Sequence, residues 1–120
     1  MGMEQAVMFP GEPPAWPAVA TRLAGRGFPV QVRMIDGLPA FPDEEPPAAW
    51  RELRVGAGAG MVTLRRTPEG VACVAWGSAE GGLRRLWDAV AWALADAGGG
   101  RVVTADGRLA ADEFARRAGL

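Results

Sequence analysis

Apolar residues recur along this chain with two different periods, and each period predicts a different kind of element. Helical spacing, with apolar residues three or four positions apart, occurs over residues 16–24 and more clearly over residues 79–97. Pro17 suits the first turn of the earlier helix, and the glycines at 98–100 suit the end of the later one. The later stretch carries one continuous apolar stripe, formed by Leu83, Leu86, Trp87, Val90, Ala91 and Leu94. We predict helices over both stretches and a short amphipathic helix over residues 110–118.

A period of two, typical of strands with one buried face, occurs elsewhere in the chain. In residues 28–35 the even-numbered positions are apolar, so Ile35 is expected on the exposed side. The pair Asp36-Gly37 then predicts a turn. Further strands are predicted over residues 50–55, 61–66, 71–76 and 101–104, and the turn at residues 67–70 makes a hairpin of the 61–66 and 71–76 strands.

These elements predict one α+β domain over residues 1–120. We expect two layers, with a mainly antiparallel sheet of four to five strands packed against two main helices, plus a short C-terminal helix. Residues 1–15 are expected to form an N-terminal arm or an edge strand. Residues 38–49 form an acidic, proline-rich loop, because proline lacks the N–H group that helices and sheets require.

Composition narrows the chemistry that is open to this chain. It contains no histidine, lysine or tyrosine, and all 13 basic residues are arginine. Catalytic triads built on histidine, Schiff-base chemistry and imidazole metal ligands are therefore excluded. One cysteine, Cys73, allows no internal disulfide, and we expect it to be a buried apolar residue. We expect no cofactor and no metal.

Charge and hydropathy indicate which partners and which location to expect. The net charge of −1 disfavours binding to nucleic acid, which depends on neutralising phosphates. The N-terminus lacks the features of a signal peptide, and no apolar run is long enough to span a bilayer. We therefore expect a soluble, cytoplasmic protein with no membrane partner. The composition, rich in alanine, glycine, proline and arginine, is typical of a GC-rich bacterial genome.

One segment has a pattern that suits anion binding. It joins a predicted strand to the start of the 79–97 helix, where free N–H groups and the helix dipole favour negative charge. The candidate anion-binding residues are Ser78, Gly81, Gly82, Arg84 and Arg85. Ordinary capping by Ser78 is the simpler interpretation, and Glu80 places a competing negative charge in the same segment.

The tryptophans provide candidates for a contact surface. Trp92 follows Trp87 by five positions, which places it nearly opposite the middle of the apolar stripe. It is therefore either covered by a second layer of the protein, or exposed as a contact residue or as a lone ring. Trp50 and Trp76 lie near the ends of predicted strands and are further candidates for an interface.

The shortage of catalytic residue types favours a non-enzymatic function. The leading hypothesis is a small protein-interaction or accessory domain that binds a protein partner or itself, with a homodimer as one form. The alternative is a domain that binds a small ligand or anion, or a degenerate enzyme, through the helix start at residues 78–82 and a nearby arginine.

Overall fold

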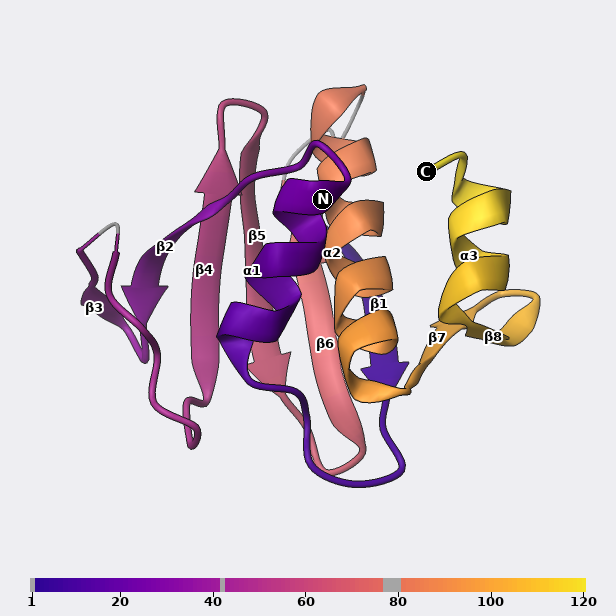
Figure 1. Ribbon diagram of the computed structural model, residues 1–120, viewed down its shortest axis with the longest axis horizontal. Coiled ribbons are helices and arrows are strands. Elements are labelled where there is room, and N and C mark those ends of the chain that lie inside the picture. The colour runs from indigo at the N-terminus through magenta and orange to yellow at the C-terminus, as the bar shows by residue number, and fades with distance from the viewer. Residues whose placement is uncertain (1, 42, 77–80) are drawn as a thin grey trace.

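The computed structural model describes residues 2–41, 43–76 and 81–120 of the chain (Figure 1). In these residues the elements follow in the order β1 (Met3–Met8), α1 (Trp16–Gly25), β2 (Gln31–Ile35), β3 (Leu38–Pro39), β4 (Glu52–Ala57), β5 (Gly60–Arg66), β6 (Gly70–Ala75), α2 (Gly82–Gly98), β7 (Arg101–Thr104), β8 (Gly107–Ala110) and α3 (Ala111–Ala118). The helices and hairpin predicted from periodicity are present, with bounds shifted by a few residues.

Eight strands of the described residues form one sheet, in the order β3-β2-β4-β5-β6-β1-β7-β8. Every neighbouring pair is antiparallel. The α+β class, the antiparallel sheet and the short C-terminal helix are therefore confirmed. The predicted strand count of four to five is wrong, because β3 and β8 are too short to show a period in the sequence and β1 joins the sheet.

The N-terminal segment lies inside the sheet and not at its edge. β1 pairs with β6 over six positions and with β7 over three. Val7, in the middle of the shared stretch, is completely buried. The first strand in the sequence therefore joins the central meander to the C-terminal β7–β8 hairpin.

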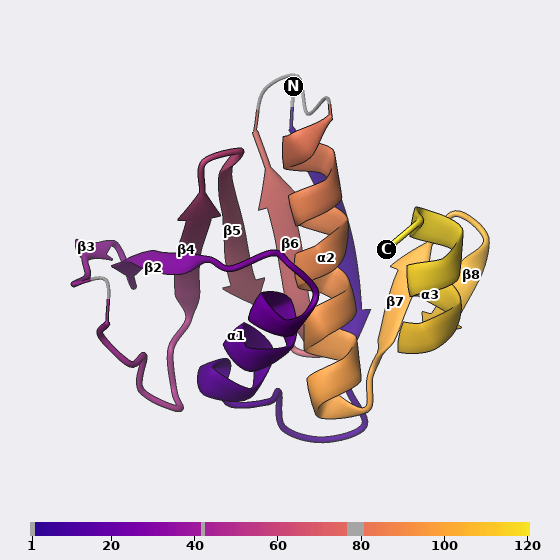
Figure 2. The ribbon, with the colours of Figure 1, turned by 45° about the horizontal axis from the view of Figure 1, so that its top comes forward.

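All three helices of the described residues lie on the same side of the sheet (Figures 1 and 2). α2 packs against α1, α3 and four strands, so nearly its whole circumference is covered. This explains why Ala89, Ala93 and Ala95 are buried although they lie outside the predicted stripe. The C-terminal end of α2 is formed by Gly99 in a left-handed conformation (φ 64), as the glycine run predicted.

A bulge in β2 changes the predicted pattern of burial. The register with β4 shifts between Val32 and Met34, which inserts one residue into β2. Ile35 consequently pairs with Leu53 and packs against the core, so its expected exposed position is wrong. The turn after it is as predicted.

That turn contains Asp36 and Gly37, with φ angles of 50 and 85. The Asp36 carboxylate accepts hydrogen bonds from the backbone N–H groups of Arg51 (2.7 Å) and Glu52 (2.9 Å). These two bonds hold the β2–β3 hairpin against the start of β4. They also lower the pKa of Asp36, because both bonds favour the charged carboxylate.

Candidate functional site

Two of the three candidate contact tryptophans lie inside the fold. Trp92 is 7% exposed, and the guanidinium of Arg26, beyond the end of α1, lies 4.5 Å from its ring. Trp50 is 2% exposed, and the guanidinium of Arg66 lies 4.6 Å from its ring. Each indole is thus covered by the chain itself, with a cation–π contact on one face.

Trp76 is different, because 60% of its surface is exposed. It follows Ala75 of β6, whose side chain belongs to the core, so strand alternation places the Trp76 side chain on the side of the sheet away from the described helices. A Cβ atom added to Gly2 would lie 2.9 Å from the Trp76 ring, so the ring rests over the backbone of Gly2. Met61 of β5, 47% exposed, covers Gly56 in the same way. Extending the β5–β6 register places Met61 directly opposite Trp76.

We call this uncovered side the open sheet face. Its charged residues are Glu4, Glu52, Arg54, Arg65, Arg101 and Arg108, placed by strand alternation and register. Glu52 forms ion pairs with Arg65 (3.2 Å) and Arg54 (3.9 Å). The face therefore combines two exposed apolar side chains with charges of both signs.

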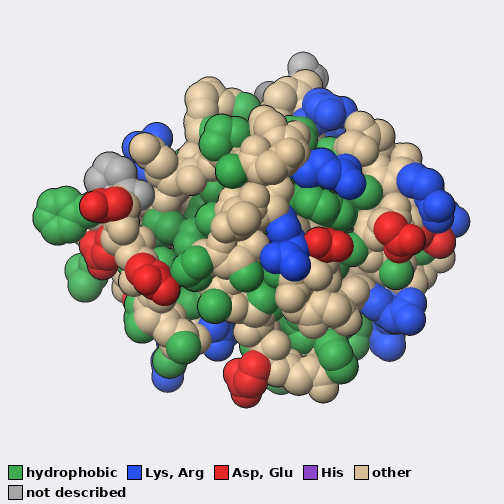
Figure 3. Space-filling model, viewed as in Figure 1, with side chains coloured by type: hydrophobic (Ala, Val, Ile, Leu, Met, Phe, Trp, Pro, Cys, Tyr) green, Lys and Arg blue, Asp and Glu red, His purple; other side chains and the backbone are tan. Residues whose placement is uncertain are grey.

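The helix-covered side carries acidic and basic side chains interspersed with apolar ones (Figure 3). Apolar side chains project at the β3 edge of this view, where Leu38 and Phe41 are 69% and 76% exposed. Leu38 and Phe41 form a second exposed apolar pair, at the edge of the sheet and away from Trp76.

The residues proposed to bind an anion do not form one group. Ser78 lies outside the described residues, and Gly81 is the residue that precedes α2. Arg85 donates to the backbone oxygen of Gly119 (3.2 Å), and its guanidinium lies 5.6 Å from the Phe28 ring. Arg84 instead lines a cleft between α2 and α3. The two arginines therefore have different neighbours.

This α2–α3 cleft, of about 570 Å³, lies between α2, α3, β1 and the β7–β8 hairpin. It exists because the β1–β7 ladder ends at the pair Ala6–Val103, so Met3–Gln5 has no partner strand on that side in the described chain. The cleft is lined by polar side chains, among them Gln5, Arg84, Asp88, Asp106 and Arg117.

Asp88 and Gln5 meet inside this cleft. Gln5 points from β1 toward the helix layer, and its Nε2 donates to Oδ1 of Asp88 over 3.3 Å. Burial raises the pKa of the Asp88 carboxyl, while the hydrogen bond from Gln5 and the charges of Arg84 and Arg85 act in the opposite direction. The carboxylate is therefore held where ionisation costs free energy.

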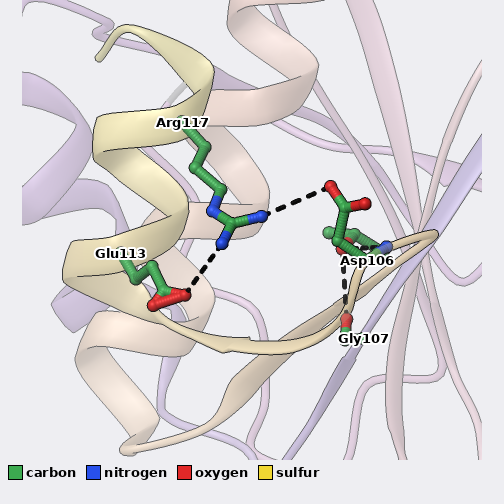
Figure 4. Close-up of polar contacts among 5 residues, drawn as sticks. Asp106, Gly107, Glu113 and Arg117 are labelled. Carbon is green, nitrogen blue, oxygen red and sulfur yellow. Dashed lines mark hydrogen bonds and ion pairs between the residues drawn. The ribbon is translucent and has the colours of Figure 1, made fainter.

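The outer rim of the cleft is made by Arg117 and the turn that faces it (Figure 4). The guanidinium of Arg117 lies 3.4 Å from Asp106 and 3.4 Å from Glu113, one turn earlier on α3. Thr104 supports the turn by donating to the carbonyl of Gly107 (3.1 Å) and accepting from the N–H of Asp106 (3.2 Å). Arg117 is thus already paired with two carboxylates.

Cys73 is buried, as expected from the sequence. Burial raises the pKa of its thiol to about 12, and the charge of Glu4 adds to this effect. Its backbone oxygen accepts a hydrogen bond of 2.9 Å from Nε1 of Trp87. A thiol that stays protonated and inaccessible is a poor nucleophile, so Cys73 serves packing.

Sequence reasoning overlooked Gln5, Asp88, Arg117 and Met61. Asp88 had a visible signal, since it is a carboxylate next to the apolar stripe of the best-defined helix. Gln5 and Arg117 had none, because they approach the cleft from opposite ends of the chain. No three carboxylate or cysteine side chains in the described ranges come together as metal ligands would.

Comparisons with protein-family models, with curated proteins and with solved structures find no match to this chain. Among the helices of the described residues, none has the length and apolarity that crossing a membrane requires.

Proposed function

We propose that this chain is a non-enzymatic protein-interaction domain that forms a homodimer through the open sheet face. The observation that carries this proposal is Trp76, whose indole is 60% exposed beside Met61 on a face that no described helix covers. Exposed apolar groups of this size mark interaction surfaces, and tryptophan is among the residues most enriched at binding hot spots. Burying the exposed part of one indole contributes about 2–4 kcal/mol.

The dimensions of the face favour a second copy of the chain as the partner. Eight strands, spaced about 4.8 Å apart and about five residues long, cover roughly 600–700 Å². This is close to the roughly 800 Å² that each partner buries in a stable interface of standard size. Two such faces can pack as the two sheets of a sandwich do.

The charges of the face are compatible with self-association. It carries four arginines and two glutamates, so a two-fold axis can set a glutamate of one copy against an arginine of the other. Glu52 pairs with Arg65 and Arg54, which reduces the positive charge that this part of the face presents. A second copy supplies both signs as well as another Trp76–Met61 pair.

The test is sedimentation velocity over a protein concentration range of about 1–500 µM, chosen to span the affinities of ordinary homodimers. We expect the wild-type chain to shift from monomer to dimer in this range. The double variant Trp76→Ala, Met61→Ser should raise the dissociation constant at least about tenfold, since it removes the anchors of the interface.

The matched control is Leu38→Ser, Phe41→Ser, which removes the exposed apolar pair at the β3 edge. This control should dimerise as the wild type does. A wild-type chain that stays monomeric at all concentrations would contradict the proposal. So would a control that dissociates while the Trp76 variant remains a dimer.

A further inference from the structure

The α2–α3 cleft contains two hydrogen-bond acceptors that no side-chain donor of the described residues reaches. Asp88 uses Oδ1 to accept from Gln5, and within the described residues no side-chain hydrogen bond or ion pair reaches its Oδ2. Gln5 donates through Nε2, so its Oε1 lies beside the carboxylate without a donor from the described chain. Two adjacent oxygens, one of them charged, suit a ligand group with several N–H bonds and a positive charge.

A positive group stands one helical turn away from these acceptors. Arg84 lines the same cleft, yet within the described residues it forms no ion pair, not even with Asp88 four positions later. Arg117 differs from it, since Asp106 and Glu113 already neutralise that guanidinium. Among the described residues, Arg84 is therefore the cation of the cleft that remains for an anionic group.

Apolar side chains form the remaining wall of the cleft. Trp87, Leu109 and Phe114 line it and belong to the hydrophobic core. The indole N–H of Trp87 is already bonded to the Cys73 carbonyl, so Trp87 offers only its apolar surface. A ligand here meets an acceptor pair, a guanidinium and a hydrophobic wall.

We propose that the α2–α3 cleft binds a free α-amino acid with an apolar side chain. The ammonium group donates to Asp88 Oδ2 and Gln5 Oε1, the carboxylate accepts from Arg84, and the side chain lies against Trp87, Leu109 and Phe114. The volume of about 570 Å³ falls in the range of small-molecule sites. This site is separate from the proposed dimer contact at Trp76.

The spacing of the two charged anchors selects an α-amino acid over a longer zwitterion. Arg84 and Asp88 are four positions apart on α2, where Cβ atoms are about 5–6 Å apart. Ligand charges held by these two residues can therefore be as close together as they are on a single α-carbon. Among the cleft residues whose side chains face the helix layer, Asp106 is paired with Arg117, so Asp88 and Arg84 remain to meet one ligand charge of each sign.

The experiment titrates the ¹⁵N-labelled full chain with three ligands that share one side chain. Leucine carries both charges, leucinamide lacks the carboxylate and N-acetylleucine lacks the ammonium. We expect leucine to shift the amide signals of Gln5, Asp88 and Thr104, and each derivative to bind at least about tenfold more weakly, since each loses a charge-assisted pair. The absence of any shift with leucine up to about 10 mM, well above the weakest specific affinities, would overturn the proposal.

Matched variants assign the two anchors. Asp88→Asn should weaken leucine binding at least about tenfold, whereas Asp112→Asn, an exposed carboxylate outside the cleft, should leave it unchanged. Arg84→Gln should weaken leucine but not leucinamide, and Arg116→Gln on the exposed side of α3 serves as its control. Equal loss in a variant and its control, or equal affinity for leucine and leucinamide, would show that the cleft does not recognise the zwitterion.

Discussion

The ionised side chain of Asp88 lowers the stability of the folded protein. Its carboxyl is half-buried, no arginine of the described chain pairs with it, and burial raises its pKa. The folded chain therefore holds this proton to higher pH than the unfolded chain, whose carboxyl titrates near 3.8. The stability associated with the protonated form is present below that value and is lost as the pH rises through the higher folded pKa.

Asp88→Asn is accordingly expected to stabilise the ligand-free protein at neutral pH. The amide keeps the oxygen that accepts from Gln5 and removes the penalty of a half-buried charge. After allowance for solvent screening we expect a gain of about 0.2–1 kcal/mol at pH 7 and none at pH 3. Urea unfolding of wild type and variant at both pH values measures this difference.

The control for this prediction is Asp43→Asn, in the exposed acidic loop, which should change stability at neither pH. If Asp88→Asn lowers stability at pH 7, the carboxylate is a structural group and not one retained for a ligand. A residue that costs stability and yet faces a cleft is typical of binding sites.

Single residues also show where sequence patterns stop being informative. The spacing of Trp92 correctly placed it off the stripe, but could not say that Arg26, just beyond α1, lies over its ring. The proximity of Arg84 and Arg85 in the sequence suggested one anion site. On a helix adjacent residues diverge by about 100°, and these two reach different neighbours.

At the scale of elements, the sequence predicted best where a segment is long and has one buried face. α1, α2, α3 and the β5–β6 hairpin follow from period and turn signals. β3 and β8, of two and four residues, are defined by their partners and not by their own composition. The bulge in β2 depends on the register with β4, which no local pattern encodes.

Gly70 is required because β1 and β6 approach each other closely. From the sequence alone it is an ordinary turn residue. Gly70 begins β6 opposite Met8, and a Cβ atom there would collide with the carbonyl oxygen of Val7. Gly70→Ala should therefore separate β1 from β6 and destabilise the fold by about 1–3 kcal/mol. Urea denaturation followed by tryptophan fluorescence measures this loss.

Gly58→Ala is the matched control, since no atom lies within 4 Å of the position that its Cβ would occupy. Its stability should stay close to that of the wild type. Similar losses in the two variants would contradict the strand contact that we describe, since Gly→Ala by itself lowers the entropy of the unfolded chain and favours the folded state.

At the scale of the whole molecule, the decisive feature is the position of β1. It pairs with β6, some seventy residues later in the chain, and with β7, nearly one hundred residues later. Hydrophobic periodicity reports which face of a strand is buried but not which strand lies beside it. The α2–α3 cleft arises where β1 and β7 separate, so this candidate site could not be located before the sheet order was known.

If the uncovered face of the sheet is a dimer interface, the Tm of the protein must depend on its concentration. If two copies pack through the open sheet face, unfolding includes dissociation, and mass action stabilises the dimer by about 1.4 kcal/mol for each tenfold rise in protein concentration. Per chain this is about 0.7 kcal/mol, and an unfolding entropy of about 2.1 cal/mol/K per residue then gives a shift in Tm of about 3 °C per tenfold. Differential scanning calorimetry over a hundredfold concentration range resolves such a shift.

We expect this shift in Tm for the wild-type chain and for the double variant Leu38→Ser, Phe41→Ser. We expect it to disappear in the double variant Trp76→Ala, Met61→Ser. A Tm independent of concentration in the wild type would mean that the open sheet face is stable as it stands in the monomer.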